Sequence, residues 1–261
     1  MSDGVVFSVF TKSWKSPAAD LAEFVRSLGF SAIELPVRPG YQGEPENVER
    51  DLPKVAKQFT DCGVQIASIA GPTDERTLAA CAAAGVPTIR VMVQIGDAGY
   101  LATVAQVQRE YDAMVPLLEK HKVRIGVQNH CDRFVCNATG LRHLVEKYDP
   151  RHIGIVWDAG HNGLNGEDPE MALDIVWSHL CVVNLKNAFW RRMNGPEAEH
   201  VQWRPYWTTG RQGLASWPRV AAELKRRGYS GILCLSAEYD DGASVNRLIA
   251  EDIAFAKSLF A

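Results

Sequence analysis

Short apolar segments alternate with amphipathic segments along the whole chain. The apolar segments are typical of buried strands, and the segments between them have the spacing of apolar residues expected for helices. The predicted strands are residues 5–10, 31–36, 64–70, 88–94, 123–129, 152–158, 180–186 and 231–238. The predicted helices are residues 17–28, 46–62, 74–84, 99–121, 138–147, 169–177, 216–228 and 244–260.

Residues at the segment boundaries support these helices. Several helices open with Ser or Asp near a proline, as in "SPAAD", "GEDPEMA" and "ASWPRV", which combines a capping side chain with a proline in the first turn. Gly29, Gly63, Gly85 and Gly228 follow helices directly, where glycine adopts the left-handed conformation that ends a helix.

Eight consecutive strand–helix units without a linker predict a single (β/α)8 barrel domain over residues 1–261. The rival is an open doubly wound sheet, which usually carries a glycine-rich turn after its first strand. Here that turn reads "TKSWKSPAAD" and has no GxGxxG motif. We therefore expect the barrel.

Composition narrows the function classes. The chain has 261 residues, a formal net charge of -3 and a pI of about 6.2, so no electrostatic argument points to nucleic acid or to an anionic membrane. No apolar run approaches the roughly 18 residues of a membrane span. The start, "MSDGVVFSVFTKSW", lacks the pattern of a signal peptide. A cytoplasmic protein is expected.

The six cysteines form no CxxC pair, and a chain of this size does not need disulfides. Cys62, Cys81, Cys181 and Cys234 are interpreted as small buried apolar residues. Cys131 and Cys136 flank "DRFV" beside His130 and raise the alternative of a zinc site, but no second His/Cys cluster supplies four ligands.

Polar residues concentrate at the ends of the predicted strands. Barrel enzymes carry their chemistry at the carboxyl ends of the strands, so these residues are the candidates for a site. They are Lys12, Trp14, Glu34, Ser68, Gln94, Gln128, Asn129, His130, Asp158, His161, Asn184, Lys186 and Glu238.

Two carboxylates stand out. Asp158 ends a strand in "VWDAGHN", where it can bind a divalent cation such as Mg²⁺ or Mn²⁺ with His161 reaching toward a substrate oxygen. The alternative is an Asp that caps the next segment and a His on the surface. Glu238 ends the eighth strand, which adjoins the first in a barrel, and can point into the mouth. Its alternative is a surface Glu near a turn.

Other residues carry weaker signals. Glu34 is expected to hydrogen-bond inside the barrel mouth or to contact substrate, and aromatic residues such as Trp14 can stack on a sugar ring or simply pack. Residues 187–216 show little helical periodicity, which is typical of a lid, a binding loop or a subunit contact in a homo-oligomer. Four arginines in this loop can meet a phosphate or carboxylate of the substrate: Arg191, Arg192, Arg204 and Arg211.

The segments "SAIELP", "VQNH", "VWDAGH", "VNLKN" and "GRQGLASWP…L…RGYSGILCLSAEY" resemble the xylose isomerase-like TIM barrel superfamily, in particular its sugar phosphate isomerase/epimerase branch. The resemblance spans essentially the full length. It implies a divalent metal with ligands at Gln128, Asp158, Asn184 and Glu238. It also implies substrate contacts at His161 and Lys186, and a carbohydrate substrate.

Two of these positions depart from the family pattern, because Gln128 stands where Glu is usual and Asn184 where His is usual. Amides attract Mn²⁺, Co²⁺ or Zn²⁺ less than carboxylate and imidazole do, so the metal site is expected to be weaker or empty. An amide also cannot act as a general base at neutral pH. The two-carboxylate route of the resembling epimerases therefore loses one partner.

Three hypotheses follow. The first is an isomerase or epimerase acting by metal-assisted proton transfer next to a carbonyl, with Glu238, His161 and Lys186 as catalytic residues and with His130, Glu34, Trp14 and Arg211 as substrate contacts. The second is a lyase or dehydratase on a sugar or polyol derivative, and the third is a non-catalytic carbohydrate-binding relative. An abasic-site DNA endonuclease fits badly, because the chain offers neither a His-rich cluster nor a basic face.

Overall fold

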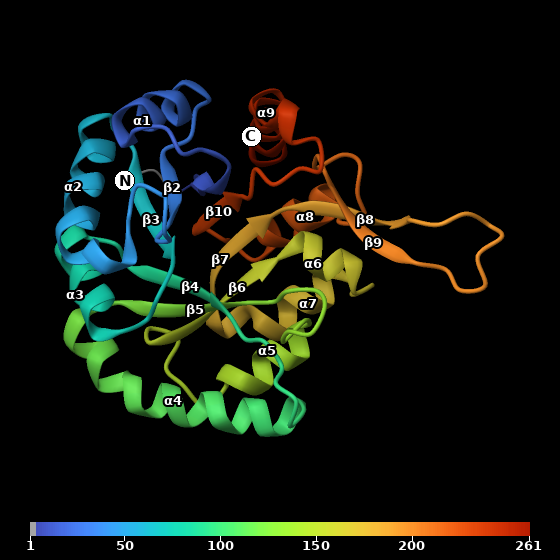
Figure 1. Ribbon diagram of the computed structural model, residues 1–261, viewed down its shortest axis with the longest axis horizontal. Coiled ribbons are helices and arrows are strands. Elements are labelled where there is room, and N and C mark those ends of the chain that lie inside the picture. The colour runs from blue at the N-terminus through green and yellow to red at the C-terminus, as the bar shows by residue number, and fades with distance from the viewer. Residues whose placement is uncertain (1–3) are drawn as a thin grey trace.

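The computed structural model describes residues 4–261. The first three residues of the N-terminal segment, in which no signal peptide is expected, lie outside the described residues. Eight parallel strands form a closed barrel in the order β1-β10-β7-β6-β5-β4-β3-β2, surrounded by helices (Figure 1). This confirms the predicted (β/α)8 barrel. The barrel strands are Val6–Phe10 (β1), Ala32–Pro36 (β2), Gln65–Ala70 (β3), Thr88–Met92 (β4), Arg124–Gln128 (β5), Ile153–Asp158 (β6), Leu180–Leu185 (β7) and Ile232–Leu235 (β10).

The helices follow the predicted segments, with one addition. They are Ala18–Ser27 (α1), Val48–Asp61 (α2), Glu75–Ala84 (α3), Tyr100–His121 (α4), Ala138–Val145 (α5), Ala159–Leu164 (α6), Pro169–Val176 (α7), Trp217–Arg226 (α8) and Val245–Phe260 (α9). Among the α-helices of residues 4–261, only the short α6 was not predicted. Asp168 caps α7 by accepting from the Met171 amide at 3.2 Å, and the four glycines predicted to end helices all have positive φ.

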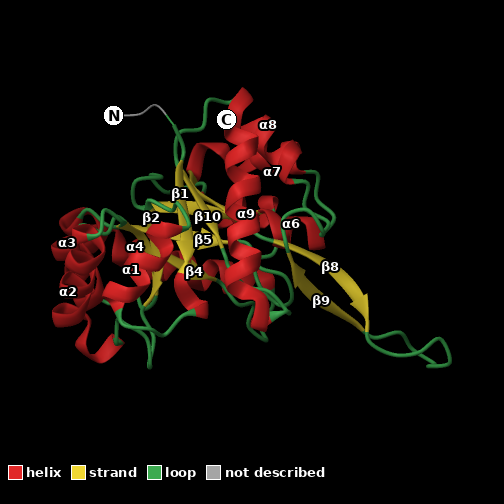
Figure 2. Cartoon of the chain, turned by 90° about the horizontal axis from the view of Figure 1, so that it is seen from above, coloured by secondary structure: helices red, strands yellow, loops and turns green. Residues whose placement is uncertain are grey.

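Residues 187–216 differ most from the expectation of an irregular loop. They contain an antiparallel hairpin of Asn187–Arg192 (β8) and Trp203–Thr208 (β9), which projects from the barrel (Figure 2). The side chain of Trp203 near its tip is 56% exposed. The base of the hairpin lies at the carboxyl end of β7, because β8 begins two residues after that strand ends.

Two main apolar cores hold the fold, besides a small cluster of Cys131, Leu164 and Ala188. The larger fills the space between the strands and the helices and includes Leu52 and Phe59 of α2, each of which contributes about 1.5–3 kcal/mol by burial. The smaller contains only strand residues, among them Phe10, Val156 and Cys234, and so lies inside the barrel. Within residues 4–261 no helix combines the length and the apolar character needed to cross a membrane.

Candidate active site at the barrel mouth

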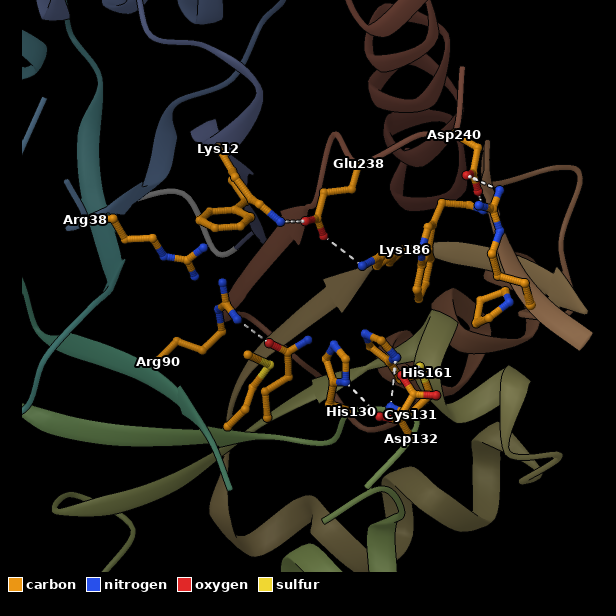
Figure 3. Close-up of a pocket in the computed structure, with 16 residues that line it drawn as sticks. Lys12, Arg38, Arg90, His130, Cys131, Asp132, His161, Lys186, Glu238 and Asp240 are labelled. Carbon is orange, nitrogen blue, oxygen red and sulfur yellow. Dashed lines mark hydrogen bonds and ion pairs between the residues drawn. The ribbon is translucent and has the colours of Figure 1, made fainter. Parts of the chain in front are cut away.

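A pocket of about 500 Å³ opens at the carboxyl ends of the barrel strands. Its polar lining is mostly charged, and Figure 3 shows the side chains pointing into it from both sides. The lining includes the basic residues Lys12, Arg38, Arg90, Lys186 and Arg204, the acidic residues Asp132, Glu238 and Asp240, and the histidines His130 and His161. The strand-end residues predicted from the sequence thus supply much of this pocket.

Gln128, Asp158 and Asn184 meet below the pocket. The strand register sets Asp158 directly beside Asn184, and Gln128 ends the neighbouring strand β5. The Gln128 amide donates to Asp158 Oδ2 at 2.8 Å, and the Asn184 amide approaches the same oxygen at 3.4 Å. Burial raises the pKa of Asp158, while the charge of Lys186 opposes this shift.

The backbone around Asp158 is fixed by Asn129 and by the start of α6. Asn129 accepts from the Asp158 amide at 2.7 Å and donates to its carbonyl at 3.1 Å. Asp158 Oδ1 accepts from the His161 amide at 3.0 Å, so the aspartate caps α6, as the alternative interpretation expected. That interpretation also placed His161 on the surface, which is wrong, because His161 is fully buried. A side chain at Gly160 would lie 2.9 Å from the Lys186 backbone, so glycine lets α6 approach the end of β7.

Glu238 is held by two lysines. Lys12 Nζ lies 2.6 Å from Oε1 and Lys186 Nζ lies 2.7 Å from Oε2 (Figure 3). Burial raises the pKa of Glu238, but the charges of Lys186 and Lys12 outweigh this and lower it to about 2. A carboxylate with such a low pKa is a weak base at neutral pH. This geometry favours a structural role that positions Lys186.

His130 and His161 lie side by side, with ring centroids 4.1 Å apart. The Cys131 amide donates to His161 Nδ1 at 3.0 Å, so this nitrogen carries no proton. The Cys131 carbonyl accepts from His130 Nδ1 at 2.8 Å, so that nitrogen does carry one. The backbone N–H and C=O of one residue, Cys131, therefore set opposite tautomers in the two rings.

The remaining nitrogens of the two rings point into the pocket (Figure 3). Burial, together with the charge of Lys186, lowers the pKa of His161 well below its usual 6.5, so this ring is neutral. His161 Nε2 then carries a proton, and it is buried without a hydrogen-bond partner among the described residues. His161 Nε2 can therefore donate a hydrogen bond to a bound molecule, while the His130 tautomer set by the Cys131 carbonyl has its lone pair at Nε2.

Arg90 and Glu34 form a buried ion pair beneath the pocket. Arg90 Nη2 lies 2.6 Å from Glu34 Oε1, and the side chains are only 7% and 1% exposed. Ser68 donates to the other Glu34 oxygen at 3.0 Å, and Arg90 Nη1 donates to the Gln128 amide oxygen. Glu34 is thus placed inside the barrel mouth, where it pairs with Arg90.

Of the four residues predicted to contact substrate, His130 lines the pocket, while Glu34, Trp14 and Arg211 do not. Trp14 donates to Asn246 at 2.8 Å and packs edge-on against Phe24. The guanidinium of Arg211 lies 3.7 Å from the centroid of the Phe255 ring on α9. Trp14 and Arg211 tie loops to helices in this structure.

Sequence reasoning missed Arg90 and Arg38 as pocket residues, whereas Trp207 was among the aromatic residues expected either to stack on a sugar ring or simply to pack. A charged residue inside the apolar segment "TIRVMVQ" was a usable signal for Arg90, because buried charges are usually paired. Trp207 of β9 packs edge-on against His161 with 5.0 Å between ring centroids, and Lys186 Nζ lies 3.6 Å from its ring centroid. The sequence indicated a lid, a binding loop or a subunit contact at residues 187–216, but not the hairpin that holds Trp207 there.

The contacts of the four predicted metal ligands do not fit a divalent cation. The Gln128 oxygen takes a hydrogen bond from Arg90, and both amides turn NH₂ groups toward Asp158. Both oxygens of Glu238 face ammonium groups. Arg90, Lys12 and Lys186 match the three carboxyl groups of Glu34, Glu238 and Asp158 in number, so the site presents no net negative charge to a cation.

A second group of ligand atoms, on His130, Cys131 and His161, lies within 4.8 Å of one another. Burial raises the pKa of the Cys131 thiol to about 12, which opposes formation of the thiolate that metals prefer. His161 Nδ1 is taken by the Cys131 amide, and Nε2 carries the proton. This group does not fit a metal ion either.

Comparisons with known proteins agree with the fold. The family model described as "Xylose isomerase-like TIM barrel" matches residues 22–259. A search of curated proteins finds no match.

Several solved structures are similar over nearly their whole length. The 3-keto-D-glucoside 4-epimerase of E. coli is 12% identical with a TM-score of 0.74, and the alignment covers 97% of this chain and 99% of that one. The probable 3-DHS dehydratase of petrobactin synthesis from Bacillus anthracis is 16% identical, with a TM-score of 0.73 and coverage of 97% and 99%. A xylose isomerase domain protein from Planctomyces limnophilus is 15% identical, with a TM-score of 0.73 and coverage of 98% and 96%. At identities this low, the TM-scores establish that the fold is shared and nothing further.

Proposed function

Because the chain belongs to the xylose isomerase-like TIM barrel family, we propose that it is an enzyme that moves a proton next to the carbonyl group of a sugar derivative. The substrate binds in the pocket at the barrel mouth. The observation that carries this proposal is the pair of opposite tautomers at His130 and His161, both of which direct a nitrogen into that pocket.

The two histidines have different roles in the proposed reaction. His161 donates its Nε2 proton in a hydrogen bond to the substrate carbonyl oxygen, and the nearby Lys186 ammonium stabilises the negative charge that develops there. His130 Nε2 takes the proton from the neighbouring carbon. The electron pair of the broken C–H bond forms a carbon–carbon double bond, while the carbonyl electron pair moves onto oxygen.

The return of the proton decides the product. If His130 delivers it to the former carbonyl carbon, and the hydroxyl proton of the neighbouring carbon passes to the former carbonyl oxygen, the result is an aldose–ketose isomerisation. If Lys186 instead delivers one of its own protons to the opposite face of the same carbon, from across the pocket (Figure 3), the result is an epimer. His130 then loses its proton to solvent and Lys186 regains one. These two outcomes keep the isomerase or epimerase class as the preferred function.

A dehydratase is the second candidate. The same first proton transfer followed by loss of a neighbouring hydroxyl group gives an elimination, which needs one base and one acid. The paired histidines meet this requirement, and one protein with a similar fold is named a dehydratase. A non-catalytic sugar-binding protein is the third.

Exchange of hydrogen for deuterium next to the carbonyl group tests all three candidate functions. The protein is incubated in D₂O with a panel of aldoses, ketoses and their acid and phosphate derivatives, and deuterium next to the carbonyl is followed by proton NMR. We expect exchange with at least one compound, slowed roughly 10²–10⁴-fold by His130→Gln. The control is His152→Gln, because His152 precedes β6 at the opposite end of the barrel.

Product analysis of the same samples separates an isomer, an epimer and a dehydrated product. Sugar binding without any exchange would refute the enzyme and leave the binding protein. Equal exchange rates in the wild type and His130→Gln would move the base to another residue.

A further inference from the structure

Arg38 and Arg90 bring two positive charges to one aromatic ring. The guanidinium carbon of Arg90 lies 4.7 Å from the centroid of the Phe10 ring, and that of Arg38 lies 5.9 Å from the same centroid. All three side chains line the pocket. Figure 3 shows the two guanidinium groups facing each other across its edge. Like charges this close repel unless an anion or solvent lies between them.

Arg90 keeps part of its hydrogen-bonding capacity free. Nε and Nη2 face Glu34, and Nη1 donates to Gln128. A guanidinium has five N–H groups, so these three contacts leave one hydrogen on each terminal nitrogen. That outer edge of Arg90 has the two-pronged shape that matches a carboxylate or a phosphate.

Arg38 has no acidic partner within residues 4–261. Its side chain is half-buried, and it takes part in no hydrogen bond or ion pair with any described residue. The acids nearby are already engaged, since Glu34 pairs with Arg90 and Glu238 with Lys12 and Lys186. Asp132 lies on the far side of the pocket from Arg38 (Figure 3).

We propose that Arg38 and Arg90 form a subsite for an anionic group of the substrate, a carboxylate or a phosphate ester. The carbonyl end of the same molecule then lies against His130 and His161. The substrate class becomes a sugar acid or a sugar phosphate, and a pocket of about 500 Å³ suits a small molecule of this kind. This inference rests on the proposed function only for the identity of the molecule that carries the anion.

Calorimetric titration of the full chain with two simple probes, inorganic phosphate and D-glycerate, tests the subsite at low ionic strength. We expect saturable binding of at least one probe to one site. Arg38→Gln should weaken it at least about tenfold, because it removes one of the two charges. Arg38→Lys should recover part of the affinity. Arg109→Gln makes the same charge change on the exposed face of α4 and should leave binding unchanged.

The outcomes distinguish the sources of the anion. Binding of phosphate alone indicates a phosphate ester, and binding of D-glycerate alone indicates a sugar acid. Binding of neither probe, or binding that Arg38→Gln does not change, overturns the proposal. Melting temperatures of all three variants check that they are folded.

Failure of this inference can be told apart from failure of the proposed function. Deuterium exchange into a neutral sugar, with no binding of either probe, would refute the anion subsite and retain the enzyme. Binding of a probe that depends on Arg38, with no exchange into any compound, would retain the subsite and refute the enzyme.

Discussion

Arg90 donates a hydrogen bond to the amide oxygen of Gln128, and this contact occupies the one Gln128 atom that could bind a metal ion. The Gln128 nitrogen faces Asp158. The positive charge of Arg90 therefore lies directly beside the predicted ligands, where a divalent cation would have to bind.

We therefore expect millimolar Mg²⁺, Mn²⁺ or EDTA to leave the melting temperature of the protein unchanged. A metal at a hundred times its dissociation constant would add about 2.7 kcal/mol to the free energy of unfolding. For a chain of this size that corresponds to a rise of at least about 5 °C, which differential scanning calorimetry detects easily. A rise of this size that Asp158→Asn abolishes would contradict the expectation and restore the predicted metal site.

The buried Arg90–Glu34 pair makes a stability prediction. Arg90→Met leaves the Glu34 carboxylate buried without its cation, which should lower the free energy of unfolding by about 3–5 kcal/mol. Adding Glu34→Gln to this variant should recover most of the loss. Urea denaturation measures each difference.

An exposed ion pair is the matched control. Arg247→Ala removes a pair with Glu251 whose side chains are 60% and 55% exposed, and this should cost less than about 1 kcal/mol. If Arg90→Met lowers the free energy of unfolding no more than Arg247→Ala does, then Glu34 changes its protonation or its contacts when Arg90 is absent.

The barrel could be predicted from the sequence because its signals are local. Strand and helix periodicities, helix caps at residues such as Asp168, and glycines such as Gly85 act within a few neighbours. The short helix α6 was not predicted, because Asp158 was interpreted as a metal ligand rather than as the residue that caps a helix. The hairpin was not predicted, because β8 and β9 expose much of both faces. This weakens the alternation of apolar and polar residues that identifies a strand.

The site could be predicted only in part. The rule that barrel chemistry lies at strand ends placed Gln128, His130, His161, Lys186 and Glu238 near one another. The contacts that give them roles come from distant segments and have no local pattern. Arg90 beside Gln128, and Lys12 beside Glu238, lie 38 and 226 residues apart in the sequence, so their pairing emerges only from the closed barrel.

The raised pKa of Asp252 predicts that the stability of the protein depends on pH. It accepts hydrogen bonds from the Gly210 amide at 2.8 Å and from the Tyr239 hydroxyl at 2.8 Å, yet burial outweighs them and raises its pKa from 3.8 to about 6. The folded state then binds the proton more tightly than the unfolded state. Ionisation of this group therefore destabilises the fold by up to roughly 3 kcal/mol above pH 6, and that penalty disappears as the pH falls toward 4.

Asp252→Asn removes this ionisation while keeping an oxygen for Gly210 and a polar partner for Tyr239. The free energy of unfolding of the variant, minus that of the wild type, should increase by about 2–3 kcal/mol between pH 4 and pH 7.5. Urea denaturation at the two pH values measures it. A difference that stays constant with pH would show that Asp252 has the same pKa in the folded and unfolded states.

The opposite tautomers of His130 and His161 can be observed directly. Long-range ¹H–¹⁵N spectra of the labelled protein near pH 8 should show a proton on Nε2 of His161, because its Nδ1 accepts from the Cys131 amide. They should show a proton on Nδ1 of His130, which donates to the Cys131 carbonyl. His200, with its side chain 88% exposed, provides the averaged reference. A proton on Nδ1 of His161 would be incompatible with the Cys131 contact, and it would remove the hydrogen-bond donor on which the proposed proton transfer depends.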